Sequence, residues 1–203
     1  RVAKTARTMS PLEQAEDFYQ RGVSAAKRHQ LQDSLTYWQQ ALRVQPEHIQ
    51  ARKQLILALI APNRSLANGL FAEGLVLHDP LDLRKWYARA LLPVAGVAEA
   101  AAILKGQDIS VAQDAEYIAL QAGLWQQAGD YALARQAYFN LLQEFPAKGL
   151  YVFGLAVAQD QLAEQEKAVE SYQRALSSDL STDLKSYSRI RIDALAQNRG
   201  AGY

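Results

Sequence analysis

The three histidines are the residues best suited to metal binding or proton transfer, but their spacing favours neither. His29, His48 and His78 are far apart, and none has a second ligand four residues away as in a His-Glu-x-x-His zinc site. The sequence contains no cysteine, which excludes disulfides, thiolate metal sites and cysteine nucleophiles. We therefore expect no metal site, and we interpret the histidines as solvated residues at helix ends.

Paired carboxylates could act as general acid and base, as at Glu13 with Glu16 or Glu164 with Glu166. Both pairs fit a solvated helix face, and nothing in the sequence marks a cleft around them. The 11 glycines form neither a G-x-G-x-x-G nor a G-K-[ST] phosphate loop. The sequence predicts a non-enzymatic protein without a cofactor, unless a catalytic domain lies elsewhere in a longer chain.

The charges are nearly balanced, with 22 Lys and Arg against 21 Asp and Glu. This balance gives no electrostatic reason to expect nucleic acid or an anionic membrane as a partner. The aromatic residues could stack on bases, but most of them fall at offsets that pack repeats together. No apolar run approaches the ~20 residues that cross a bilayer. We expect protein or peptide partners, no nucleic acid and no direct membrane insertion.

The elements that would position these side chains are helices throughout. Apolar and polar residues do not alternate as in strands, and the helix formers Ala, Leu, Gln and Glu dominate. Residues 10–13, Ser-Pro-Leu-Glu, combine an N-cap serine, a proline at the first helical position and a capping-box glutamate. Residues 110–113 repeat the capping pattern, and Ser181 or Asp183 could open the last helix.

Internal repetition is the main indication of the fold. A small residue is followed four positions later by an aromatic, three later by an aliphatic residue, and five later by proline or leucine. The units start at Ser34, Ala134 and Ala168, separated by 100 and 34 residues, and ~34 residues is the tetratricopeptide period. The three sets are Ser34, Trp38, Ala41 and Pro46; Ala134, Tyr138, Leu141 and Pro146; and Ala168, Tyr172, Ala175 and Leu180.

The expected fold is all-α: a right-handed superhelical solenoid of about five tetratricopeptide-type hairpins with a C-terminal capping helix, eleven helices in all. Two weaker units fill the gap after the first, and Gly96 opens a turn in the second of these. The expected boundaries are a flexible segment at 1–9, a repeat domain at 10–197 with hairpins near 11–46, 48–80, 81–106, 110–146 and 148–178 and a cap at 181–197, and a flexible tail at 198–203.

The repeat pattern also assigns packing roles. We expect Trp38 and Tyr138 to fill the space between hairpins, and Pro62 and Pro93 to interrupt the second and third hairpins. In the capping helix, four residues share one face and are expected to cover the last hairpin, with Leu195 beside them. These four residues are Leu184, Tyr187, Ile190 and Ala194.

The first helices of successive hairpins should line a concave surface, which is the candidate binding site. Its basic members fall in the first three repeats and its apolar and acidic members in the last. A peptide with an acidic end could therefore lie along this surface, with the Arg89 guanidinium donating two hydrogen bonds to a carboxylate. The candidate partner-binding residues are Tyr19, Val23, Arg52, Lys85, Arg89, Phe153, Val157 and Asp160, and the same register includes Lys27, Ile56, Glu116 and Gln126.

The hairpin signatures identify the chain as resembling tetratricopeptide repeat proteins over residues 11–197. Residues 145–195, FPAKGLYVFGLAVAQDQLAEQEKAVESYQRALSSDLSTDLKSYSRIRIDAL, and 41–55, ALRVQPEHIQARKQL, further resemble the MshN family of mannose-sensitive haemagglutinin (type IV) pilus biogenesis proteins. This resemblance implies a periplasmic repeat domain, anchored to the bacterial inner membrane by a segment upstream, that holds other pilus-assembly components. No catalytic residue is carried over.

The alternative is a cytoplasmic co-chaperone or regulatory adaptor that clamps a peptide terminus. That function needs basic and amide side chains converging from neighbouring repeats, and Arg52, Lys85 and Arg89 form only part of such a set. Because the chain starts at Arg1, we expect it to be cut from a longer precursor. A homo-oligomer is left open.

Overall fold

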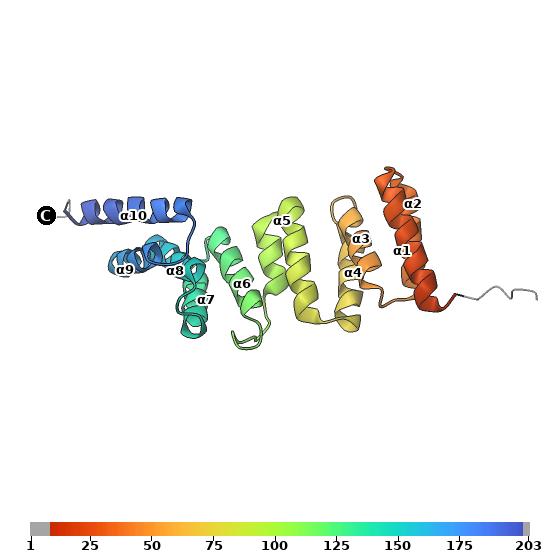
Figure 1. The fold of residues 1–203 in the computed structure, drawn as a ribbon, viewed down its shortest axis with the longest axis horizontal. Coiled ribbons are helices and arrows are strands. Elements are labelled where there is room, and N and C mark those ends of the chain that lie inside the picture. The colour runs from red at the N-terminus through yellow and green to blue at the C-terminus, as the bar shows by residue number, and fades with distance from the viewer. Residues whose placement is uncertain (1–8, 201–203) are drawn as a thin grey trace, which may run out of the picture. The chain divides into compact units, whose positions relative to one another are not determined.

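A computed structural model describes the backbone of residues 9–200 and the side chains of residues 9–197. This part of the chain forms ten helices and no strand, joined by short loops (Figure 1). The expected all-α class is confirmed. Of the expected flexible ends, 1–8 and 201–203 lie outside the described residues, and 198–200 continue the last helix. The helices are α1 (Pro11–Lys27), α2 (Leu31–Val44), α3 (Ile49–Leu59), α4 (Arg64–Leu77), α5 (Pro80–Leu104), α6 (Ala115–Ala128), α7 (Tyr131–Glu144), α8 (Gly149–Gln161), α9 (Gln165–Leu176) and α10 (Thr182–Gly200).

Helix α5 is broken at Gly96, which has φ 81° and ψ −177°. Only glycine adopts such backbone angles without strain. The break divides α5 into two helical segments, which accounts for the eleven helices expected. The expectation that Pro93 would make this interruption is wrong, because Pro93 lies inside the first segment. Pro62 does fall between α3 and α4, as expected.

By length and composition alone, α5 could cross a membrane. The break at Gly96 leaves two segments, each shorter than the ~20 residues that a span requires. Leu83, Tyr87 and Leu91 of its first segment are buried in the protein. We therefore interpret the two segments of α5 as repeat helices.

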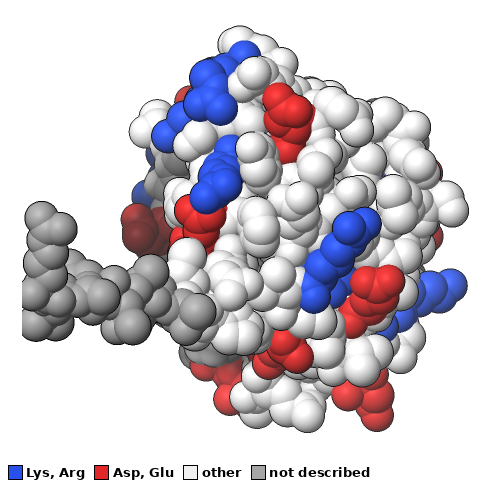
Figure 2. All heavy atoms as spheres, turned by 90° about the vertical axis from the view of Figure 1, so that its right-hand side faces the viewer, with Lys and Arg blue, Asp and Glu red and all other residues white. Residues whose placement is uncertain are grey.

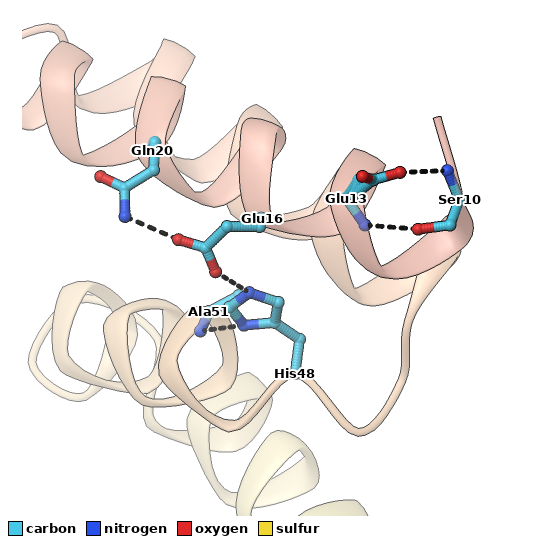
Figure 3. Close-up of polar contacts among 6 residues, drawn as sticks. All are labelled: Ser10, Glu13, Glu16, Gln20, His48 and Ala51. Atoms are coloured by element: carbon cyan, nitrogen blue, oxygen red, sulfur yellow. Dashed lines mark hydrogen bonds and ion pairs between the residues drawn. The ribbon is translucent and has the colours of Figure 1, made fainter. Parts of the chain in front are cut away.

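The sequence analysis predicted the N-cap of α1 correctly but not the N-cap of α6. Ser10 and Glu13 form the expected capping box, in which each backbone N–H donates to the other side chain (Figure 3). The similar pattern at 110–113 forms a turn instead, and α6 begins after Asp114, whose carboxylate accepts from the Tyr117 N–H at 2.9 Å. A carboxylate is a strong N-cap, so Asp114 takes the position that Ser110 was expected to hold.

The chain divides into two compact units, residues 1–94 and 95–203. In the first unit α1 packs on α2, α2 on α3, and α3 on α4. Trp38 is buried, as expected, but the contact with Gly22 lies within the first hairpin and not between hairpins: a Cβ on this glycine of α1 would overlap the indole ring. Phe71 of α4 stacks on Tyr87 of α5 with ring centroids 4.2 Å apart.

The interpretation of all three histidines as solvated is wrong for His48, whose side chain is only 7% exposed. His48 is the N-cap of α3: its Nδ1 accepts from the Ala51 N–H, and its Nε2 lies 3.2 Å from a carboxylate oxygen of Glu16 on α1 (Figure 3). Because Gln20 also donates to Glu16, these side chains link α1 to the start of α3. His48 therefore has a structural role.

The second unit packs α6 on α7, α7 on α8, α8 on α9, and α9 on α10. Tyr138 of α7 is buried, as expected, and its ring presses on the backbone of Gly154 in α8. At the start of the unit, the Tyr117 hydroxyl and the Gln121 side-chain amide both donate to the carbonyl of Leu104, at 2.9 and 3.1 Å. These bonds tie α6 to the end of α5.

Helix α10 covers the last hairpin with part of the expected face, because the Tyr187 ring meets those of Phe153 and Tyr172. Leu195 joins Ala156, Ala168 and Tyr172 in a buried cluster, and Ser188 is also buried. Ile190, expected to face inward, is 65% exposed. The Ser188 hydroxyl donates to the Leu184 carbonyl, and this bond allows a polar residue to occupy the buried face.

Candidate functional site

A groove of about 400 Å³ lies in the second unit between α6, α8 and the first turn of α10. We call it the α6–α8 groove. Helices α6 and α8 are the first helices of their hairpins, which is where the sequence placed the binding surface. The lining residues are Ala119, Gly123, Gln126, Gln127, Tyr138, Leu150, Tyr151, Phe153, Gly154 and Leu184.

Small residues make this groove. Gly123 on α6 has only the Tyr138 hydroxyl near its side-chain position, 3.9 Å from where a Cβ would lie. Gly154 on α8 leaves room for the Tyr138 ring, which reaches in from α7 between the two helices. The ring therefore forms part of the groove floor and carries its hydroxyl group towards α6.

Aromatic side chains form one wall. The ring of Phe153 meets those of Tyr187 and Tyr172 edge to face, with centroids 5.7 and 6.2 Å away. Tyr151 makes a similar contact with Phe145 at 6.3 Å. These contacts fix the orientation of the rings, so the wall is largely formed before any ligand binds.

The polar groups of the groove are few and uncharged. No Lys, Arg, Asp or Glu is among the described residues that line it. Burial, together with the neighbouring Tyr151, raises the pKa of Tyr138 to about 12, so this hydroxyl keeps its proton at neutral pH. The side-chain oxygen of Gln126 is buried without a hydrogen-bond partner in the described part of the chain.

The structure brings only some of the candidate residues from the end of the chain into this groove. Phe153 and Gln126 line it. Val157 packs on the buried cluster under α10. The Asp160 side chain is 4% exposed and accepts two bonds from Arg191, at 2.8 and 2.9 Å, and one from the Tyr172 hydroxyl. Asp160 therefore holds α10 in place and is not free for a partner.

The basic candidates of the first unit do not form an exposed set. The Arg52 side chain is 2% exposed and donates to the carbonyls of Pro46 and Leu70 and to Glu73. Lys85 is buried and lies 3.0 Å from Asp82. Arg89 is exposed, and Tyr19 and Val23 are partly exposed on α1. Arg52 and Lys85 are thus structural residues, which corrects the expected basic surface.

Lys53 and Trp86, which follow Arg52 and Lys85, face each other across α3 and α5, with the ammonium 5.2 Å from the centre of the indole ring. A cation over an indole face is a favourable pair.

The sequence analysis did not predict Leu150, Tyr151 and Gln127 as groove residues. The only feature of the sequence that could have indicated them is their spacing from Phe153 and Gln126 on the same helices.

A second depression in the same unit is lined by residues of α7, α8 and α9. Its two parts, of about 330 and 370 Å³, share Phe139, Leu155, Gln159 and Lys167. Its rim is charged but largely engaged: Arg135 and Lys167 both pair with Glu164. The α6–α8 groove, with its unengaged polar groups, is the better candidate for ligand binding.

No group of His, Asp and Glu that could hold a metal ion occurs among the described residues. On the face over α1 and α2, basic and acidic side chains are interspersed in a mostly uncharged surface (Figure 2). This face has no single-sign patch of the kind that binds nucleic acid.

The chain was compared with known proteins by sequence and by structure. No family model matches its sequence, and no curated protein matches it either. Solved structures do match. One is YrrB, described as a tetratricopeptide protein with an unusual peptide-binding site, with a TM-score of 0.59, 15% identity, and coverage of 86% of this chain and 91% of that one.

Two further solved structures match over most of their length. MamA has a TM-score of 0.57 and 14% identity, with 81% of this chain and 91% of that one covered. PilW, described as a widely conserved type IV pilus biogenesis factor, has a TM-score of 0.52 and 14% identity, with 93% and 87% covered. The chain has the tetratricopeptide repeat fold. Repeat folds of this kind present extended surfaces, and the α6–α8 groove is a formed surface on this chain.

Proposed function

We propose that this tetratricopeptide chain is a non-enzymatic scaffold that binds a segment of a partner protein in the α6–α8 groove. The main support for the proposal is the groove itself, which is apolar and lies on the first helices of two hairpins. It also contains a buried side-chain oxygen, that of Gln126, which no described residue hydrogen-bonds. Repeat arrays present such surfaces to extended or helical segments. Phe153 and Leu150 would supply apolar anchoring contacts.

We further propose that the partners are components of a type IV pilus assembly machine at the periplasmic side of the inner membrane. Support comes from the resemblance of residues 145–195 and 41–55 to MshN-type pilus biogenesis proteins. PilW, a pilus biogenesis factor, shares the fold, although at 14% identity it supports the fold alone. The co-chaperone alternative has less support, because Arg52 is buried and Lys85 is engaged by Asp82.

The test uses a pair of matched leucines. Leu150 on α8 lines the groove and is 54% exposed, whereas Leu133 on α7 is 50% exposed and is not among the groove residues. Each lies near the start of its helix, so glutamate should be tolerated equally at both. Leu150→Glu should abolish capture of inner-membrane pilus-assembly proteins from cell envelopes, and Leu133→Glu should not.

The readout is affinity capture with identification of the bound proteins, alongside melting curves of both variants. Equal capture by the two variants would remove the groove from the proposal. Capture of cytoplasmic chaperones in place of pilus components would favour the co-chaperone alternative.

A further inference from the structure

Two hydrogen-bonding groups in the α6–α8 groove have no partner in the described part of the chain. One is the side-chain oxygen of Gln126, which is buried, and the other is the hydroxyl of Tyr138. Most buried polar groups in proteins are hydrogen-bonded, so the buried Gln126 oxygen, left without a partner near the Tyr138 hydroxyl, indicates a bound state that satisfies it.

The Tyr138 hydroxyl and the Gln126 side chain both lie at the α6 side of the groove. The Tyr138 hydroxyl is 3.9 Å from where a Cβ on Gly123 would lie, and Gln126 is three residues beyond Gly123 on the same helix. Residues three apart on a helix are neighbours on one face. A ligand group beside Gly123 is therefore within reach of both side chains.

The pair is complementary to a peptide group. A hydroxyl that keeps its proton donates to a carbonyl oxygen, and a carboxamide oxygen accepts from an N–H, so together they match the one acceptor and one donor of a peptide unit. The Gln126 oxygen faces into the protein, but the terminal torsion of glutamine is broad and roughly two-fold. Half a turn of the carboxamide presents the oxygen to the groove.

We propose that the α6–α8 groove recognises an internal, uncharged apolar segment of the partner, and holds one of its peptide groups between Tyr138 and Gln126. Charge complementarity selects this occupant, because none of the described lining residues could pair with a terminal carboxylate or ammonium. An apolar side chain of the segment lies against Phe153 and Leu184. This inference rests on the proposed scaffold function, and it replaces the acidic-ended peptide expected from the sequence.

The experiment titrates the isotope-labelled full chain with three small probes and follows amide NMR shifts. The probes are N-acetyl-leucine N-methylamide, which is uncharged, N-acetyl-leucine, which carries a carboxylate, and leucine N-methylamide, which carries an ammonium group. Only the uncharged probe should shift the Gly123 and Gly154 amides and the Gln126 side-chain amide, with a dissociation constant of roughly millimolar order for so small a ligand. Tighter binding of either charged probe would overturn the inference.

Two variants test the polar pair. Tyr138→Phe keeps the ring against Gly154 and removes only the hydroxyl, and Gln126→Met keeps the side-chain length. Each should weaken binding of the uncharged probe about 2- to 10-fold, the range for one hydrogen bond. Gln143→Met, on α7 outside the α6–α8 groove, is the control and should leave binding unchanged, and melting curves verify folding. Unchanged binding by Tyr138→Phe would contradict the proposal.

Two other outcomes separate this inference from the scaffold function. If the probe fails to bind while Leu150→Glu still abolishes partner capture, the peptide-group inference is wrong and the scaffold function stands. If the probe binds but no partner is captured, the scaffold function fails. Shifts of the groove amides that grow with protein concentration alone would identify the occupant as a second copy of the chain, and would overturn the inference.

Discussion

Gly154 and Tyr138 show how one missing methyl group shapes both packing and the groove. A Cβ at Gly154 would overlap the Tyr138 ring, whereas a Cβ at Gly123 would meet only the Tyr138 hydroxyl at 3.9 Å, an ordinary contact. The same substitution should therefore have opposite effects at two glycines that line one groove.

We expect Gly154→Ala to lower the free energy of unfolding by about 1–3 kcal/mol, because the ring must move to admit the methyl group. Gly123→Ala should be neutral or stabilising by up to ~1 kcal/mol, since alanine is the better helix former. Urea unfolding of both variants measures the difference. A stable Gly154→Ala variant would show that Tyr138 is not confined as described.

Asp160 of α8 and Arg191 of α10 form an ion pair that holds the last helix in place. The carboxylate is almost fully buried and the guanidinium is one-third exposed, and two hydrogen bonds join them between α8 and α10. The Asp160 hydrogen bond is the main reason that the pKa of Arg191 is raised above its ordinary value. Removing one partner of a buried pair leaves the other charge uncompensated.

Arg191→Ala should therefore cost about 1–3 kcal/mol of stability, less than for a fully buried pair because Arg191 is partly solvated. Arg189→Ala is the matched control, because Arg189 lies on the same helix and is exposed. Thermal unfolding distinguishes the two. Equal melting temperatures would show that the Asp160 contact does not secure α10.

At the scale of elements, α10 covers a surface that the last hairpin cannot cover itself. Ala156, Ala168 and Tyr172 are buried against Leu195 and, beside it, Ile192. A chain truncated before Ser181 should expose this cluster and lose stability or aggregate, because a repeat array needs a cap at its end. Melting curves and light scattering test this expectation. A monomeric truncated chain with an unchanged melting temperature would refute the capping role.

The loops after α2 and α7 each contain a proline whose carbonyl accepts a hydrogen bond from an arginine on a later helix. Arg52, on the following α3, donates to the Pro46 carbonyl at 3.0 Å. Arg174, on α9 and exposed, donates to the Pro146 carbonyl. The proline carbonyl after the hairpin thus has a hydrogen-bond donor in each unit. Of the two donors, Arg52 is buried and Arg174 is exposed.

Arg52→Met should be strongly destabilising, by roughly 2–4 kcal/mol, because three acceptors lose a buried charged donor. Arg174→Met should cost less than ~1 kcal/mol, because water can replace an exposed donor. Chemical unfolding of the two variants measures the contrast. Similar losses would indicate that burial of Arg52 contributes little.

At the scale of the whole molecule, the net charge of +1 and the uncharged lining of the groove have the same consequence for binding. Charge steering should contribute little to partner association. We expect the affinity for a captured partner to change less than about 3-fold between ~0.05 and ~0.5 M salt, a range over which screening of surface charges changes greatly. Surface plasmon resonance measures this, and a steep loss with salt would indicate a charged interface elsewhere on the chain.

The helical class, the hairpin repeat and the burial of Trp38 and Tyr138 could be predicted from the amino-acid sequence alone. These depend on short spacings along the chain: a period of ~34 residues, offsets of three and four that define a helix face, and prolines that end helices. Such signals are local, so they can be read without knowing what lies across the core. Phe153 and Gln126 were placed in the groove for the same reason.

The burial of individual polar residues, and the way α10 lies on the last hairpin, depend on contacts between helices that are distant in sequence. Arg52 and Asp160 are charged, as surface residues usually are, but both side chains are buried. Partners on other helices satisfy the hydrogen-bonding groups of both side chains inside the protein. Ser188 is buried and Ile190 is exposed, and the hydrogen bond from Ser188 to the Leu184 carbonyl satisfies the buried hydroxyl. A side chain's environment is set by neighbours distant in sequence, and the spacing along one helix does not contain them.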